Sequence, residues 1–309
     1  MTGSVLLALL PIVILIGLGM VLRRRGFLAD SFWGQAERLG YFVLLPCLFF
    51  DGLAMAQLQS LPVGELALTL ILSTILVAAL VVILKPLMRL DGPAFTSVFQ
   101  GSVRFNNYVG VTLAAGLFGA KGIALAAICN AAIVPTVNIL CVLVFARFGS
   151  AKLSGRGILK QLVTNPLVVA SLGGILFQAL GLTIPAGIES AMKALGAASL
   201  PLGLLCIGAA LEFRSARQWV GPVVTSSIMK FLAMPLATVM ITMLTGLSGA
   251  ALTTAVLFQV LPTASSAYIM ARQLGGDAPL MAGITATQTL LALAAIPLVL
   301  IGLSDWLVL

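Results

Sequence analysis

The sequence predicts an all-α integral membrane protein with ten transmembrane helices, arranged as two inverted five-helix repeats in which helices 4 and 9 are broken. Three observations lead to this fold class: a very apolar composition, ten separate apolar segments, and a partial repeat between the two halves. Apolar residues make up 61% of the 309 residues and charged residues only 8%, with a mean hydropathy of +1.17. Ordinary soluble domains contain about 25% charged residues. The chain is therefore expected to lie in a lipid bilayer.

A helix needs ~20 apolar residues to cross a bilayer. Ten segments meet this length, with approximate limits of 4–22, 38–57, 63–85, 94–118, 122–147, 163–182, 190–211, 218–245, 250–272 and 279–303. Most connections are short, and the longest lies at 148–162. It divides the chain into a first five-helix repeat at 1–147 and a second at 163–309.

Basic residues predict the orientation of these segments, because Lys and Arg gather in cytoplasmic loops. The loops after odd-numbered helices and their margins contain thirteen of them: Arg23, Arg24, Arg25, Arg38, Lys85, Arg89, Arg147, Lys152, Arg156, Lys160, Arg214, Arg217 and Arg272. The loops after even-numbered helices contain only Lys121 and Lys193. Both termini are thus expected on the periplasmic side of a bacterial inner membrane, and the linker 148–162 in the cytoplasm. Loop placement accounts for the formal charge of +8, so no nucleic-acid partner is expected.

The two halves share a partial sequence repeat. Pro11 returns as Pro166 and Pro46 returns as Pro201, each 155 residues later. The pair Phe99-Gln100 likewise returns as Phe258-Gln259, with a small gap in register. Because each half holds five helices, the halves enter the membrane from opposite sides. Inverted repeats of this kind are typical of secondary transporters.

The fourth and ninth helices are expected to be broken near the centre of the bilayer, at Gly110 and Pro262. The polar side chains beside these breaks are Arg104, Asn106 and Asn107 in the fourth helix and Thr263, Ser265 and Ser266 in the ninth. Such side chains can satisfy backbone groups that a break leaves unpaired. Two facing helix N-termini would then attract an anion. The alternative is that Gly and Pro only kink these helices.

Three charged residues are expected inside the spans: Arg104, Lys230 and Asp51. An intramembrane charge is costly and is by default functional. Arg104 would bind a carboxylate through two parallel N–H groups, or else take part in a structural ion pair. Lys230 and Asp51 would serve coupling or support, with Asp51 as a proton carrier or a counter-charge. Asn130 and Gln288 are expected to hydrogen-bond between helices and are assigned to the same supporting role.

The residue types present exclude several function classes. There is no histidine, which removes His-based zinc sites and Ser-His catalysis, and the four cysteines lack a metal-site spacing. We therefore expect no metal, organic cofactor or catalytic residue, while sodium or proton coupling stays open. An intramembrane enzyme would have only Ser226 or Ser227 with Lys230, a commonplace spacing. A cation antiporter would need acidic residues at the breaks, and neither break contains Asp or Glu.

Four motifs resemble bacterial members of the auxin efflux carrier family. They are Arg104-Phe105-Asn106-Asn107-Tyr108-Val109-Gly110, the stretch from Pro262 to Arg272, Gly275-Gly276-Asp277, and Leu44-Leu45-Pro46. The resemblance covers essentially the whole chain. It implies ten helices in two inverted repeats, with helices 4 and 9 crossing in a transport domain that moves against a scaffold of helices 1, 2, 6 and 7.

The resemblance also implies a substrate class. Bacterial relatives are assigned to malonate, malate and similar acids, and plant relatives export the auxin anion. The family's asparagine before the first break falls on Asn106, and its proline in the second break falls on Pro262. The expected function is secondary transport of a small mono- or dicarboxylate by alternating access. The expected partners are this anion and the lipid bilayer, and a homodimer is left open.

Overall fold

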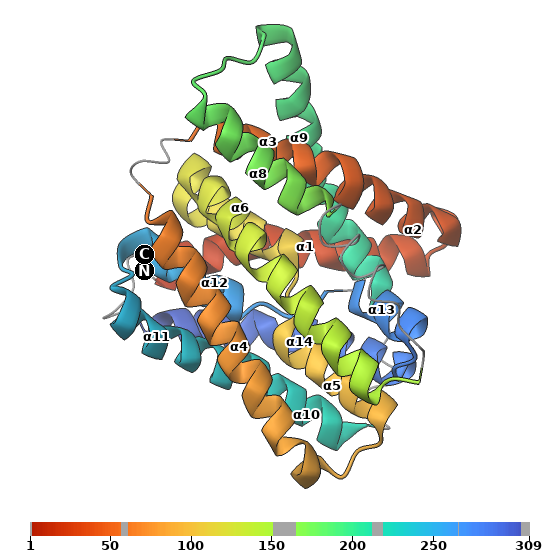
Figure 1. Ribbon diagram of the computed structural model, residues 1–309. Helices are drawn as coiled ribbons and strands as arrows, with labels where there is room; N and C mark the ends of the chain where they lie inside the picture. Colours follow the sequence, from red (N-terminus) through yellow and green to blue (C-terminus); the bar gives the residue numbers. More distant parts are fainter. Residues whose placement is uncertain (1, 57–60, 151–164, 212–218, 265, 304–309) are drawn as a thin grey trace.

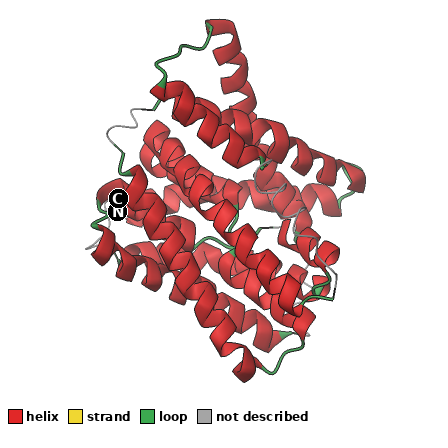
Figure 2. Cartoon of the chain, viewed as in Figure 1, coloured by secondary structure: helices red, strands yellow, loops and turns green. Residues whose placement is uncertain are grey.

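A computed structural model describes residues 2–303, apart from 57–60, 151–164, 212–218 and 265. Within these ranges every regular element is a helix (Figure 2), which confirms the all-α class. The elements in chain order are α1 (Thr2–Arg24), α2 (Asp30–Leu39), η1 (Gly40–Leu44), α3 (Leu45–Ala54), α4 (Val63–Met88), α5 (Gly92–Val103), α6 (Asn107–Phe148), α8 (Pro166–Ala179), α9 (Ala186–Ala210), α10 (Val220–Ile228), η4 (Met229–Ala233), α11 (Met234–Thr245), α12 (Gly249–Gln259), α13 (Ser266–Leu274) and α14 (Ala278–Gly302).

Six helical stretches in the described part of the chain are long and apolar enough to cross a membrane. They are Leu7–Arg24, Val63–Met88, Gly92–Phe148, Ala186–Ala210, Val220–Thr245 and Ala278–Gly302. α8 and α12 are apolar but shorter. The protein is therefore a multi-pass membrane protein. The count of ten spans, and their inverted arrangement, remain predictions.

In two places a π-helical turn lies just before a proline. η1 precedes Pro46, and η4 precedes Pro235. A proline inside a helix has no N–H to donate, and its ring clashes with the carbonyl four residues earlier. In both cases that carbonyl belongs to the π-helical turn, which therefore accommodates the ring while the helix continues.

The helices pack in two groups (Figure 1). In the first group, α1 and α2 pack against α9, and α3 packs against α8 and α9. In the second group, α4 packs against α5 and α11, while α5 also packs against α10 and α14. α6 is kinked at Gly119, where the backbone is not helical (φ 57°, ψ −137°), and it contacts members of both groups, including α3, α8, α4 and α12. Any relative movement of the two groups would therefore involve contacts of α6.

α1 and α9 approach each other closely through two glycines. A Cβ atom added at Gly19 would lie 2.0 Å from the backbone oxygen of Leu205, and one at Gly208 would lie 1.9 Å from that of Ile16. No larger side chain fits at either position without separating the helices. Small residues serve this purpose in membrane helix pairs because they let the backbones approach.

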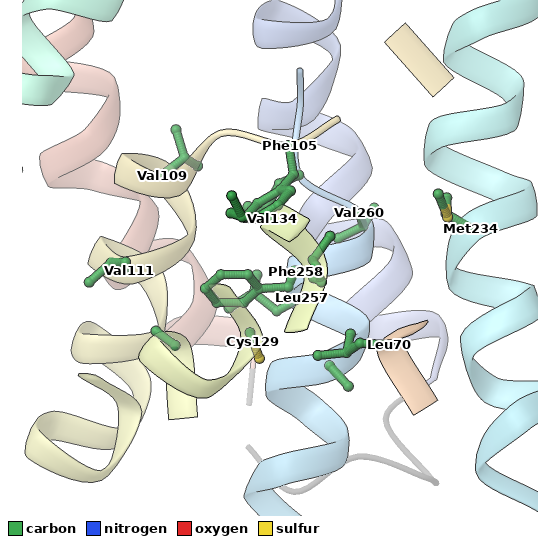
Figure 3. Close-up of a cluster of buried hydrophobic side chains, with 14 of the residues drawn as sticks. Leu70, Phe105, Val109, Val111, Cys129, Val134, Met234, Leu257, Phe258 and Val260 are labelled. Carbon is green, nitrogen blue, oxygen red and sulfur yellow. The ribbon is translucent and has the colours of Figure 1, made fainter. Parts of the chain in front are cut away.

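The largest hydrophobic cluster lies against both helix interruptions (Figure 3). Phe105, between Arg104 and Asn106, packs on Phe258 of α12 with ring centroids 5.8 Å apart. Leu70 of α4 and Val260 belong to the same cluster and are fully buried. The irregular backbone is thus enclosed by packed side chains rather than facing lipid, as the energetics of unpaired backbone groups demand.

Candidate functional site

The first interruption lies between α5 and α6. α5 ends at Val103, Arg104 is extended (φ −76°, ψ 159°), and Asn106 is extended as well (φ −97°, ψ 108°). The Oδ1 atom of Asn106 accepts hydrogen bonds from the N–H groups of Tyr108 at 3.1 Å and Val109 at 3.4 Å. Asn106 is therefore the N-cap of α6, and it satisfies two of the donors that a helix start leaves unpaired.

Gly110 is not the point where the helix breaks. It lies in the first turn of α6, and its N–H donates to the Asn106 carbonyl at 3.1 Å. Because the side chain of Asn106 caps the helix, α6 begins at Asn107, earlier than the position of Gly110 indicates. Gly110 has a packing role instead: an added Cβ would lie 2.5 Å from Leu261 Cδ1 and 3.0 Å from Phe258 Cζ. Because glycine has no side chain, Leu261 in the second interruption can lie close to the backbone of Gly110.

The second interruption lies between Gln259, the last residue of α12, and Ser266, the first of α13. Pro262 and Thr263 are buried in this segment. Ser265, expected to contribute a hydroxyl, lies outside the described residues. Pro262 fits an interruption because it cannot donate a backbone hydrogen bond.

Gln288 of α14 joins the two interruptions. Its Oε1 accepts from the Thr263 N–H at 3.1 Å, and its Nε2 donates to the Gly101 carbonyl in the last turn of α5 at 2.9 Å. The side chain is fully buried. Gln288 thus forms hydrogen bonds between helices, as expected, and these two bonds connect the first interruption with the second.

Arg104 is half-buried and extends from the first interruption towards α6 and α13. One of its terminal nitrogens donates to Asn138 Oδ1 at 3.1 Å and contacts Met270 Sδ at 3.4 Å, and the other donates to Ser266 Oγ at 3.4 Å. None of the described Asp and Glu side chains forms an ion pair with it. A guanidinium has five N–H donors and is always charged, so its charge is not neutralised by these contacts.

Two further polar atoms beside the interruptions lack a hydrogen-bond partner within the described ranges. They are Oδ1 of Asn107, the first residue of α6, and Oγ1 of Thr263. Buried polar atoms without partners are uncommon and need an explanation. The Thr263 hydroxyl and the N–H groups of Arg104 can donate to the acceptor oxygens of an anion, whereas Asn107 Oδ1 is itself an acceptor and requires a donor.

The structure separates the other charged candidates. Asp51 lies on α3 and lines a cavity of about 440 Å³ between α3, α6 and α9, together with Lys121 and Lys193. It makes no ion pair with Arg104 or with Lys230. Asp51 thus belongs to the first helix group. It is not paired with either of the cations for which it was considered as a counter-charge.

Asn130 and Lys230 are both fully buried. The Nδ2 of Asn130 donates to the Ala126 carbonyl one turn earlier in α6, at 2.8 Å, so no bond between helices is found for it. Lys230 lies in η4, and its Nζ has no hydrogen-bond partner among the described residues. Among all the described residues, no group of three His, Cys, Asp or Glu side chains could hold a metal ion.

Two sets of contacts were missed by sequence reasoning. Gln259, at the end of α12, donates to Ser73 Oγ at 2.9 Å and to Thr74 Oγ1 at 3.0 Å on α4. Tyr108 packs on Gly203 of α9, where an added Cβ would lie 2.1 Å from the ring. The repeated Phe-Gln pair pointed to Gln259, but nothing in the sequence identified the residues on the facing helices.

Comparison with known proteins identifies the family. The model of a family described as "Membrane transport protein" matches residues 4–300. The chain belongs to this family. It is the auxin efflux carrier family that the motifs around Arg104 and Pro262 resemble.

Two relatives of the family resemble the chain along nearly its whole length. An uncharacterized transporter of Methanothermobacter thermautotrophicus is 26% identical over 292 residues, covering 94% of this chain and 95% of that protein. An uncharacterized transporter of Methanocaldococcus jannaschii is 23% identical over 295 residues, covering 92% and 95%. Both names agree with a transport protein.

Proposed function

We propose that the protein is a secondary transporter of a small organic anion, such as a mono- or dicarboxylate of the malonate or malate type. Family membership supports transport in general. The anion is inferred from the site: the cation of Arg104 lies at the first interruption without an acidic partner among the described residues. This observation carries the proposal, because a cation inside a membrane is costly unless an anion or another acceptor compensates it.

The substrate carboxylate binds between the two interruptions. Arg104, Asn107 and the N-terminal turn of α6 contribute donors on one side, and Thr263 and Ser266 contribute hydroxyls on the other, with Pro262 and Ser265 in the same segment. The N-terminus of α6 adds a partial positive charge that requires no titratable group. The surrounding wall is built from Phe105, Tyr108 and small apolar residues, and this favours a compact acid over a large amphipathic one.

Transport proceeds by alternating access. The second helix group, with α5, α12 and α13, moves against the first group, formed by α1, α2, α3, α8 and α9. In this proposal the chain forms ten membrane spans in two inverted halves, 1–147 and 163–309. The separate packing of the two groups supports such a movement.

The proposal includes a topology. Both termini face the periplasm across a bacterial inner membrane, and the linker 148–162 faces the cytoplasm. This rests on the distribution of Lys and Arg between the loops. The lipid bilayer and the anion are the proposed partners, and no metal or organic cofactor takes part in transport.

The test is a flux assay. Purified protein is reconstituted into liposomes, and uptake of radiolabelled malonate, malate and indole acetate is compared with protein-free liposomes and with an equal amount of glucose or sodium ions as tracer. We expect saturable uptake of at least one carboxylate that is inhibited by the others. Sodium flux without carboxylate flux, or no flux of any carboxylate, would contradict the proposal.

A further inference from the structure

Lys230 is a buried basic side chain that the site described above does not use. It is fully buried, and among the described residues its Nζ has neither a hydrogen bond nor an ion pair. It lies in η4, the π-helical turn that precedes Pro235. A buried polar group without partners is costly, so a lysine kept here needs a reason.

The helix that carries Lys230 packs beside the first interruption. Ser226, one turn earlier, lies close to Gly101 of α5: an added Cβ on Gly101 would be 3.2 Å from Ser226 Cβ. The carbonyl of Gly101 accepts the bond from Gln288 that links the two interruptions. η4 itself contacts α5 and α14. The turn that carries Lys230 therefore packs against two of the helices that hold the anion site together.

The internal repeat matches Lys230 with a short stretch of the first half. The matched positions of the two halves are 155 to 159 residues apart, as in Pro46 and Pro201 or Gln100 and Gln259. On this spacing Lys230 corresponds to the stretch 71–75, which contains Ser73 and Thr74, the two hydroxyl partners of Gln259. Gln100, the counterpart of Gln259, lies in the first half and has a buried Oε1 without a partner among the described residues. Two hydroxyls of the first half thus correspond to a lysine in the second half.

Few charged groups surround this lysine. The elements that pack against η4 are α4, α5, α10, α11 and α14. α5, α10, α11 and α14 contain no Asp, Glu, Lys or Arg, and α4 contains only Glu65 in its first turn and Lys85 in its last. Neither of these forms an ion pair or a hydrogen bond with Lys230. The nearest cation along the chain from α5 is Arg104, which cannot lose its proton.

A lysine in such surroundings is stable in two forms: as a neutral amine, or as an ammonium whose charge is balanced by a nearby anion. The anion proposed above would supply that balance on arriving at the interruption. Lysines exchange protons readily when buried, in contrast to arginines. The two cations near the site thus have different chemistry, one of fixed charge and one that can gain and lose a proton.

We propose that Lys230 takes up one proton when the organic anion binds and releases it when the anion leaves, so that the carrier moves anion and proton together. The lone pair of the amine accepts a proton from a hydronium ion on the side to which the site is open, which leaves a water molecule there. The resulting ammonium returns this proton to water on the other side, where a hydronium ion forms and the neutral amine is restored. The inference rests on the proposed function, because it requires an anion at the interruptions.

Proteoliposomes with a pH gradient test the proposal. Malonate accumulation is measured with the lumen one pH unit more alkaline than the outside and with the membrane voltage clamped by potassium and valinomycin. For one proton per anion, the gradient changes the accumulation ratio about tenfold, and a trapped pH dye should report acidification of the lumen during uptake. Protein-free liposomes correct for the acid that crosses the lipid unaided.

Three variants test whether Lys230 is the residue that carries the proton. Lys230→Met and Lys230→Arg cannot exchange a proton at this position, so the pH gradient should no longer change their accumulation ratio. Lys193→Met removes an exposed lysine and should keep the tenfold effect. Gel filtration and thermal unfolding check that each variant is folded. Loss of the fold in both Lys230 variants, with Lys193→Met intact, would mark Lys230 as a structural residue and overturn the proposal.

The outcomes separate this proposal from the proposed function. If the parent protein carries no organic acid, the function itself fails. If it carries malonate without moving a proton, or if either Lys230 variant still moves a proton with each anion, transport of anions stands and only the role of Lys230 is rejected. A purely structural lysine would change the rate or the stability without removing the response to the pH gradient.

Discussion

The side-chain oxygen of Gln288 accepts a hydrogen bond from the Thr263 backbone at 3.1 Å. Since the amide nitrogen of Gln288 donates to the Gly101 carbonyl, one buried side chain connects α5, α14 and the segment after α12. Together with the hydrogen bond from Arg104 to Ser266, this side chain holds the two interruptions in their relative position.

Gln288→Leu should destabilise the protein and impair transport. It leaves the Thr263 N–H and the Gly101 carbonyl without partners, at a cost of about 1–3 kcal/mol for each group. Thermal unfolding in detergent and malonate flux measure the two effects. Thr287→Val, which changes the neighbouring and less buried side chain, should have little effect. Equal stability of Gln288→Leu and the parent would show that the bridge is unimportant.

Asn106→Ala should weaken both the start of α6 and the binding of the anion. Loss of the N-cap costs about 0.5–2 kcal/mol of stability, and loss of a polar contact to a charged ligand lowers affinity roughly ten- to a hundredfold.

Asn106→Asp separates the two effects, because a carboxylate caps a helix well but repels an anion. It should unfold at a temperature close to that of the parent and still fail to transport. Unchanged affinity and flux in Asn106→Ala would remove this residue from the site.

Arg104→Gln should abolish transport, because it removes the charge at the first interruption. Arg104→Lys keeps the charge but loses the planar fork, so a large loss indicates bidentate contact and a mild loss indicates an electrostatic role. Arg272→Gln is the matched control, since Arg272 is exposed and lies over the ring of Tyr268. Parental rates in Arg104→Gln would make Arg104 a structural residue.

Gly203→Ala should disturb the contact between the two helix groups. The new methyl would lie about 2 Å from the Tyr108 ring, a distance that forces the ring or α9 to move. We expect a lower unfolding temperature and altered flux, both partly restored by adding Tyr108→Ala. Gly187→Ala, where an added Cβ meets nothing within 4 Å, is the control. Additive effects of the two changes would contradict a direct coupling.

Cysteine labelling tests the topology. A cysteine at Ser154 in the linker should not react with a membrane-impermeant reagent added to intact cells, because the linker is predicted to be cytoplasmic. A cysteine at Thr183, in the exposed connection between α8 and α9, should react. Reaction at Ser154 and protection at Thr183 would invert the proposed orientation.

The sequence predicted the all-helical membrane class and most helix limits because these depend on apolar composition, which is read locally, while the ten spans and their inverted repeat stay predictions. It located the interruptions within a few residues, and the error at Gly110 has a local cause. A glycine permits a break, but the side chain of Asn106 determines where the next helix begins. Capping geometry depends on a backbone conformation that a single sequence does not specify.

The site residues were only partly predictable. Gln288 was chosen as a buried amide, yet its two partners come from segments about 25 and 187 residues away. Lys230 and Asp51 were treated as possible counter-charges, and the structure assigns them to different helix groups. The contact of Tyr108 with Gly203 depends on how two groups of helices dock. Such pairings need three-dimensional information that hydropathy and motif spacing do not contain.

The charge of Arg104, which forms no ion pair with any described acidic side chain, has an electrical consequence. If the junction of α5 and α6 moves through the membrane field, this charge moves with it. Carrying one elementary charge across 100 mV changes the free energy by about 2.3 kcal/mol. The membrane voltage would therefore favour one orientation of the empty carrier, and a dianion bound to a carrier with charged Arg104 and protonated Lys230 would cancel that preference. The return of the empty protein, rather than the loaded step, would then be the voltage-sensitive half of the cycle.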